Sequence, residues 1–231
     1  MAKKGKKYLQ AKEKIEDREY TLKDAIYLLK EIKSSNFDES VDVSMNLNVD
    51  PKYADQMVRG TVSLPHGTGK TVKVLVIASG EKQKEAEEAG ADYVGGEEMV
   101  EKIQKENWFD FDVVVSTPDM MKHVGKLGKL LGPKGLMPSP KSGTVTFNLK
   151  PVIEEIKSGR VEFKVDKTGN IHSSVGKISF DAEKLYENAK TFIVAVIKAR
   201  PVSLKGKYVK GLYISTTMSP SIRLGVQEFE R

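Results

Sequence analysis

The residues best suited to chemistry are a glycine-lysine-threonine run and three histidines. Gly69-Lys70-Thr71 ends like a phosphate-binding loop, but that loop also needs a glycine where the chain has Leu64. The loop opens a helix as well, whereas the residues that follow here have the pattern of a strand. No metal-ligand spacing and no Ser-His-acid set joins the histidines, which are His66, His123 and His172. We therefore expect no catalytic residue, no metal site and no cofactor.

The composition limits which cellular compartment and which kinds of partner are expected. The 231 residues include no cysteine, which excludes disulfides, thiolate metal sites and cysteine nucleophiles. The formal net charge of +6 suits a polyanionic partner. Four lysines lie within residues 1–7 and no apolar stretch follows them, so we expect a disordered basic arm, solvated or touching nucleic acid, and no signal peptide. The lack of cysteine fits a cytoplasmic protein, and no window approaches the roughly 20 apolar residues of a membrane span.

Three segments carry residue types that suit RNA. Ser34–Phe37 offers an aromatic side chain, Asp166–His172 is a turn that follows Lys164, and Ser215–Ser221 packs small hydroxyls around Met218. Double-stranded RNA is read by shape and by 2′-hydroxyl contacts across a wide minor groove, which small hydroxyls and backbone amides can approach closely. Each segment on its own could equally be a capped turn.

Two styles of secondary structure must position these residues. Residues 39–49 alternate strictly between apolar and polar, as in a strand with one buried face, and residues 57–64 form a second strand. Val72–Ala78 and Asp112–Ser116 are almost wholly apolar, which is typical of parallel strands, and helices alternate with them. The pattern predicts an α/β and α+β protein of two domains. Residues 1–67 plus 160–231 form a discontinuous two-layer α+β domain, and residues 68–159 form an inserted three-layer, Rossmann-like α/β domain.

Charge separates the same two parts. Residues 68–159 hold 13 Lys+Arg and 14 Asp+Glu, a net of −1. The remainder holds 38 − 13 = 25 and 32 − 14 = 18, a net of +7. Glycines and small residues at the two crossings predict a hinge, at Gly67 and Gly69 and at Ser158 and Gly159.

Further elements are predicted along the chain. Thr21 should cap a helix, with Asp24 completing a capping box, and residues 181–200 should form a long helix. Residues 161–165 and 171–175 read as a β-hairpin around Asp166–Gly169. Residues 144–149 and 208–217 are predicted strands, and the last dozen residues are predicted to be irregular.

The stretch Gly125–Thr144 is rich in glycine, proline and lysine, so the prediction is a basic loop without a regular element. Its apolar residues suggest that it is pinned to a surface, and no carboxylate neighbours its lysines between residues 120 and 153. A protein-interaction module that grips an acidic partner through this loop is one alternative function. An enzyme on the doubly wound sheet is another, although no acid, base or phosphate loop is found for it.

Five motifs resemble, in order, those of the bacterial branch of ribosomal protein one of the large subunit, the protein of the mobile stalk. They span much of residues 37–221 and are Arg59–Gly67, Glu85–Gly96, Leu130–Pro138, Asp166–His172 and Thr216–Met218. The resemblance implies a ribosomal RNA-binding protein without catalysis. It also implies that the split domain makes the main RNA contact and that the inserted domain moves on a hinge.

The resemblance implies partners and site residues too. The partners would be large-subunit ribosomal RNA, tRNA in the exit site and the operon mRNA that the protein represses, with the protein a monomer within the ribosome and away from membranes. The implied RNA-binding residues are Phe37, Ser40, Lys164, Lys167, Thr168, His172, Ser215, Thr217 and Met218. Candidates that face tRNA are Lys126, Lys129 and Lys134. The chain departs from the family at Asn36, often lysine, and at Ser219, often glycine.

Overall fold

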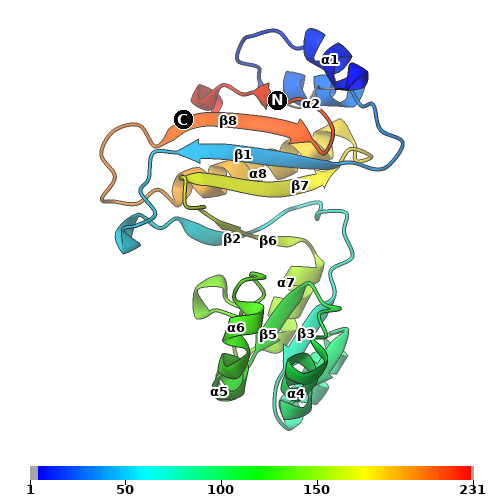
Figure 1. Ribbon diagram of the computed structural model, residues 1–231, viewed down its shortest axis with the longest axis vertical. Helices are drawn as coiled ribbons and strands as arrows, with labels where there is room; N and C mark the ends of the chain where they lie inside the picture. Colours follow the sequence, from blue (N-terminus) through cyan, green and yellow to red (C-terminus); the bar gives the residue numbers. More distant parts are fainter. Residues whose placement is uncertain (1–4, 230–231) are drawn as a thin grey trace. The chain divides into compact units, whose positions relative to one another are not determined.

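The computed structural model describes residues 5–229, so Lys3 and Lys4 of the predicted basic arm lie outside the described residues. The fold is mixed α/β, which confirms the predicted class, and it divides into two compact units. Unit 1 holds the described residues up to Gly69 and from Val161 onward, and unit 2 is Lys70–Arg160. Figure 1 shows the helices and strands of each unit. None of the helices within residues 5–229 combines the length and apolar character that a membrane span requires.

Unit 1 is built on a four-stranded sheet in the order β7-β1-β8-β9, and every neighbouring pair is antiparallel. The strands are β1 (Ser40–Leu47), β7 (Asn170–Lys177), β8 (Val209–Thr216) and β9 (Ile222–Arg223). Residues in β1 alternate between buried and half-buried, as the sequence predicts. The buried set packs on α2 (Leu22–Glu31) and α8 (Ala182–Lys198), so these helices cover one face and leave the other open (Figure 1).

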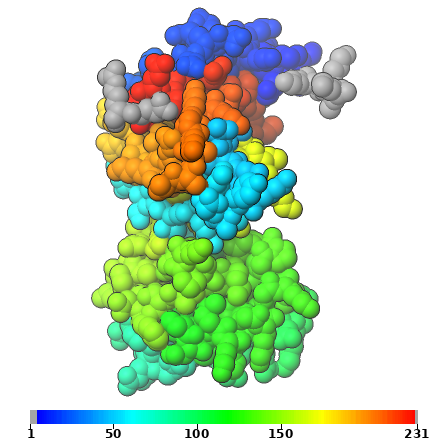
Figure 2. Space-filling view, turned by 90° about the vertical axis from the view of Figure 1, so that its left-hand side faces the viewer, coloured from blue at the N-terminus to red at the C-terminus, as the bar shows by residue number. Residues whose placement is uncertain are grey.

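Both helices begin and pack as their sequences predict. Thr21 caps α2, accepting a hydrogen bond from the backbone amide of Asp24. Leu185, Phe192 and Val196 lie on the buried face of α8. At the C-terminal end of β1, the segment after β1 and the segment before β8 lie side by side (Figure 2). There the amide of Asn48 donates to the carbonyl of Tyr208.

The predicted β-hairpin is wrong in its pairing, although its turn is present. Strand β6 (Arg160–Lys164) pairs with β2 (Arg59–Ser63) in a separate two-stranded sheet, while β7 pairs with β1. Phe163 of β6 packs edge-on against Phe192 of α8, with ring centroids 5.8 Å apart. Burial of Phe163 on the helix thus favours a partner for β6 other than its sequence neighbour.

The ends of the chain are more regular than predicted. Lys6 and Lys7, assigned to the basic arm, begin helix α1 (Lys6–Glu13). The last dozen residues include β9 and the short 3-10 helix η5 (Val226–Glu228). Leu224 forms a bridge with Tyr20, so the C-terminal segment packs beside the start of α2. Another 3-10 turn, η1 (Ala54–Gln56), precedes β2.

Unit 2 has a parallel sheet in the order β4-β3-β5, with a hydrophobic core on each face. Its strands are β3 (Val74–Ile77), β4 (Tyr93–Gly95) and β5 (Val113–Ser116). One face packs on α3 (Glu81–Glu88) and α7 (Leu149–Lys157). The other packs on α4 (Glu97–Glu106), η2 (Pro118–Met120), α5 (Met121–Val124), η3 (Gly125–Leu127) and α6 (Gly128–Leu131). All four β3 residues are buried because successive side chains enter opposite cores.

Two predictions fail in unit 2. Residues 144–149 do not form a strand: Val145 makes an isolated bridge with Ser116, and Leu149 already begins α7. The stretch Gly125–Thr144 is not without regular structure, because it contains η3, α6 and η4 (Pro140–Ser142). Leu127 and Leu131 are fully buried, so the expected pinning of this stretch is present.

The predicted hinge residues are each held within one unit. The buried side-chain amide of Asn188 accepts a hydrogen bond from the amide of His66 (3.1 Å) and donates to the carbonyls of Gly67 and Val175 (both 2.8 Å). Gly69 has a left-handed φ of +70°, and an added Cβ would meet Phe180 at 3.0 Å. At the other crossing, Ser158 caps α7. A hinge role for these residues stays a prediction.

Replacing Asn188 with alanine should destabilise unit 1 by about 2–4 kcal/mol, because three backbone groups lose their buried partner. Urea unfolding of Asn188→Ala measures this, with Asn148→Ala, at an exposed position whose side chain makes no capping bond, as the control. Equal stability of the two variants would contradict a stabilising role for the hydrogen bonds of Asn188.

Candidate nucleic-acid interface

The surface with the most unusual chemistry is organised by a buried carboxylate. Glu39 is 1% exposed and lies just before β1, in phase with the buried residues of that strand. Its carboxylate accepts hydrogen bonds from the hydroxyls of Ser35 and Thr216 and, at 3.0 Å, from the backbone amide of Met218. One side chain therefore ties the segment before β1 to the segment after β8.

The hydrogen bonds decide the ionisation of Glu39. Burial is the largest single influence and disfavours the charged form. The donors from Ser35, Thr216 and Met218 together outweigh it and hold the pKa of Glu39 below its usual value. The carboxylate is therefore charged at neutral pH and is a strong acceptor for all three donors.

Two large apolar side chains beside this carboxylate are exposed. Phe37 is 52% and Met218 56% exposed, although most large apolar side chains of the described chain are buried. Next to them, the amide of Ser40 donates to the hydroxyl of Thr217 at 3.2 Å, and Lys177 donates to the hydroxyl of Ser40 at 3.0 Å. We call Phe37, Ser40, Thr217 and Met218 the end patch. It is a small, mostly uncharged surface held in a defined shape.

The hydroxyl of Ser219, one of the two departures from the resembled motifs, points back into the same turn. The hydroxyl accepts from the amide of Thr216 at 2.9 Å and donates to the carbonyl of Pro220 at 3.1 Å. The departure thus adds hydrogen bonds inside the turn. Asn36, the other departure, is exposed.

The open face of the sheet continues from the end patch as a grid of small polar side chains. Strand register sets Asp42 opposite Ser174 and Ser215, and Ser44 opposite His172. The hydroxyl of Ser44 is 3.0 Å from Nδ1 of His172, which leaves Nε2 without a partner among the described residues. Further along, Asn46 donates to Asn170 at 2.6 Å. Hydroxyls, amides, an imidazole and one carboxylate line this part of the face, and Tyr213 and Arg223 continue it toward β9.

The turn at the opposite end of the strands is organised by Asp166. Its carboxylate accepts from the amides of Asn170 and Thr168, both at 2.8 Å, and from the hydroxyl of Thr168. The Asn170 amide is the main cause that lowers the pKa of Asp166. Gly169 has a φ of +83° and accepts from the amide of Leu47. Lys167 is exposed on this turn, whereas the hydroxyl of Thr168 is already committed to Asp166.

The structure thus brings most predicted RNA-binding residues to one face, spread along it. The end patch and the turn lie at opposite ends of the strands, roughly 20 Å apart at about 3.3 Å per residue, with His172 and Ser215 on the strands between. Lys164 is exposed but belongs to the two-stranded sheet with β2 and not to the four-stranded sheet. The spread suits an extended partner better than a small ligand.

Sequence reasoning missed Glu39, Thr216 and Tyr8. Glu39 and Thr216 continue the buried phases of β1 and β8, so a polar residue in a buried register was the available signal. Tyr8 of α1 lines a groove with Phe37 and Met218, a contact between distant segments that no local pattern indicates.

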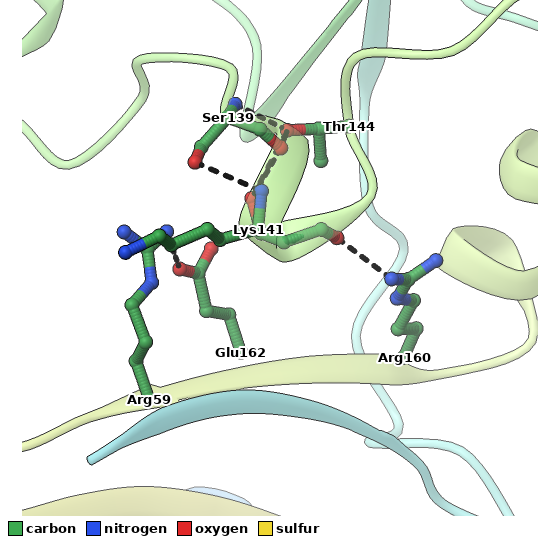
Figure 3. A network of polar contacts seen from close by, with 7 residues as sticks. Arg59, Ser139, Lys141, Thr144, Arg160 and Glu162 are labelled. Atoms are coloured by element: carbon green, nitrogen blue, oxygen red, sulfur yellow. Dashed lines mark hydrogen bonds and ion pairs between the residues drawn. The ribbon is translucent and has the colours of Figure 1, made fainter.

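The lysines proposed to face tRNA lie in unit 2. Lys126 is in η3 and Lys129 is in α6, both exposed beside the buried leucines of those turns. Lys134 lies with its amine 3.9 Å from the ring centroid of Phe109, a cation–π contact that holds its loop. The neighbouring loop of residues 139–144 is closed by the hydroxyl of Thr144, and Arg160 donates to the carbonyl of Ser142 at 2.7 Å (Figure 3).

Residues 5–229 contain no cluster of three or more histidine, aspartate or glutamate side chains arranged to hold a metal ion. The arrangement offers surface recognition: shape, hydroxyls and two apolar contacts.

Comparison with known proteins identifies the class. A sequence profile of the Ribosomal protein L1p/L10e family matches residues 29–220, and the chain belongs to this family. It is 60% identical over 225 residues to "Large ribosomal subunit protein uL1" of Solibacter usitatus (strain Ellin6076), covering 97% of this chain and 95% of that protein. It is 61% identical over 230 residues to the protein of the same name from Persephonella marina (strain DSM 14350 / EX-H1), covering 98% and 95%.

Family membership confirms three predictions: the resemblance itself, a structural rather than enzymatic protein, and a place at the ribosome in the cytoplasm. An enzyme on the doubly wound sheet is thereby excluded.

Replacing Glu39 with glutamine should destabilise unit 1 by about 1–3 kcal/mol near neutral pH, because a charged acceptor of buried hydrogen bonds is lost. Since the folded-state pKa of Glu39 lies below its ordinary value of 4.5, its stabilisation is present above that value and is lost as pH falls through the folded pKa. The difference between Glu39→Gln and the original chain should therefore shrink in acid. Unfolding free energies from pH 7 downward measure it, with exposed Glu13→Gln as control. A pH-independent difference would contradict the account.

Proposed function

We propose that the chain binds large-subunit ribosomal RNA at the mobile stalk through the end patch and the open face of the four-stranded sheet. The observation that carries this proposal is the set of hydrogen bonds to the buried Glu39 carboxylate. They hold exposed Phe37 and Met218 beside the hydroxyls of Ser40 and Thr217. Apolar side chains of this kind can lie against ribose, and small hydroxyls can meet 2′-hydroxyl groups across a shallow minor groove.

Electrostatics supports recognition by shape with a modest ionic contribution. The open face carries hydroxyl, amide and imidazole groups, with Arg223 on β9 paired to Glu19, and lysines such as Lys167 and Lys177 lie at its ends. Outside residues 68–159 the chain has a net charge of +7. Lysines that meet phosphates release counterions, so the affinity should fall with salt.

The finer roles proposed for the chain follow from the resemblance of its motifs. Unit 2 moves relative to unit 1 on the crossings at Gly67–Gly69 and Ser158–Gly159, and its lysines Lys126, Lys129 and Lys134 meet tRNA in the exit site and assist its release. Unit 1 also binds a similar RNA fold in the operon mRNA and represses translation. The protein acts as a monomer within the large subunit, in the cytoplasm.

Truncating the end patch should weaken binding to a stalk RNA fragment. Loss of a buried apolar side chain costs roughly 1.5–3 kcal/mol, so Phe37→Ala and Met218→Ala should each raise Kd by about 10- to 100-fold. Filter binding at fixed salt measures this.

Matched controls come from exposed residues elsewhere. Met57 is 43% and Phe147 51% exposed and neither belongs to the end patch, so Met57→Ala and Phe147→Ala remove the same kinds of side chain at other positions. Unchanged affinity in Phe37→Ala and Met218→Ala, with folding intact, would remove the end patch as the RNA site.

The division of labour between the units makes a separate prediction. Lys126→Gln with Lys129→Gln should leave affinity for the stalk RNA within about twofold, because these lysines lie outside the proposed RNA surface. The same pair should reduce crosslinking of the protein to exit-site tRNA in ribosomes. Lys84→Gln with Lys150→Gln, also exposed in unit 2, is the charge-matched control. A large loss of stalk RNA affinity in the first pair would show that unit 2 had been assigned the wrong partner.

A further inference from the structure

Helix α1 forms one wall of a groove next to the end patch. The groove has a volume of about 530 Å³, within the range typical of ligand sites. Tyr8 and Lys7 line it from α1, Ser34 and Ser35 line it from the segment after α2, and Phe37 and Met218 close it. Its lining is mostly apolar, so the groove is a surface that aromatic groups can enter.

The packing of α1 within unit 1 gives little reason for its presence there. Ala11 is its only buried residue, and Leu9 is 46% exposed. Its polar anchors include Lys7, which donates to the carbonyl of Ser34 at 3.0 Å, and Lys14, just past its end, which pairs with Glu31 at 2.8 Å, both at the surface. An eight-residue helix is marginal in water, and burying one alanine adds little stability. A bound partner that covers the groove would bury the aromatic wall and stabilise the helix.

The chemistry of the groove points to RNA as that partner. Tyr8 and Phe37 offer aromatic rings, Met218 offers a flexible apolar side chain, and Lys7 lies at the wall. Unstacked bases bind to aromatic side chains flanked by cations, and this stacking is tolerant of sequence. Three lysines against one glutamate in α1 disfavour a basic partner and suit a polyanion.

We propose that this groove holds an unstacked base of the RNA that covers the end patch, with Tyr8 as its stacking wall and Lys7 meeting the adjacent phosphate. The inference rests on the proposed function, because Phe37 and Met218 belong to both surfaces. It extends the RNA site from the sheet to α1. It also gives α1 a role in affinity that its packing does not explain.

The test uses the full chain and the stalk RNA fragment. Base stacking contributes about 1–3 kcal/mol, so Tyr8→Ala should raise Kd by roughly 5- to 100-fold, while Tyr8→Phe should bind normally. Gln10→Ala, exposed on the same helix, is the control. Lys7→Gln should reduce the salt slope of log K by about one. Ultraviolet crosslinking of the unmodified chain should join an RNA base to the peptide that contains Tyr8.

The outcomes separate this inference from the function on which it rests. If Met218→Ala weakens binding while Tyr8→Ala and the Lys7→Gln salt slope are unchanged, the groove is not part of the RNA site, and the end patch stands. If Met218→Ala also binds normally, the proposed function fails and the inference fails with it. If Tyr8→Ala does not fold, the absence of a crosslink at Tyr8 in the unmodified chain overturns the proposal.

Discussion

The surface of unit 1 depends on one buried carboxylate. A buried charged group is stable only when hydrogen-bond donors surround it. The donors to Glu39 come from two segments: Ser35 is close in the chain, whereas Thr216 and Met218 are 177 and 179 residues away. Satisfying the charge therefore brings the segment before β1 and the segment after β8 together. The exposed positions of Phe37 and Met218 follow from that closure, since both lie within two residues of a group bonded to Glu39.

This arrangement separates the work of shaping the surface from the work of contacting a partner. Glu39, Thr216 and Ser35 lie behind the surface and hold it, while the end patch presents small hydroxyls and apolar atoms. A pre-shaped surface loses little conformational entropy on binding. The same logic recurs at the opposite end of the sheet, where Asp166 holds its turn and Lys167 stays exposed.

Much of the fold could be predicted because its elements follow simple periods. The alternation in β1, the N-cap at Thr21 and the apolar strand β3 are local signals, and the structure contains each of them, although Asp24 bonds the hydroxyl of Thr21 instead of its backbone amide. The pairing of β6 could not be read, because the turn at Asp166–Gly169 is local whereas the contact of Phe163 with Phe192 is not. Leu127 and Leu131 are spaced one helical turn apart, but the surrounding glycines and prolines hid that period.

The candidate site divides in the same way. Phe37 and Met218 could be predicted as candidates from their residue types and from the motif resemblance, whereas Glu39 and the α1 groove arise from contacts across the whole of unit 1. Hydrogen exchange of the full chain with and without stalk RNA tests the central claim most directly. The amide of Met218, bonded to Glu39, should already exchange slowly in the free protein, and peptides spanning residues 34–40 and 215–221 should slow further with RNA. Fast exchange at Met218 in the free protein, or identical exchange of both peptides with and without RNA, would contradict the account.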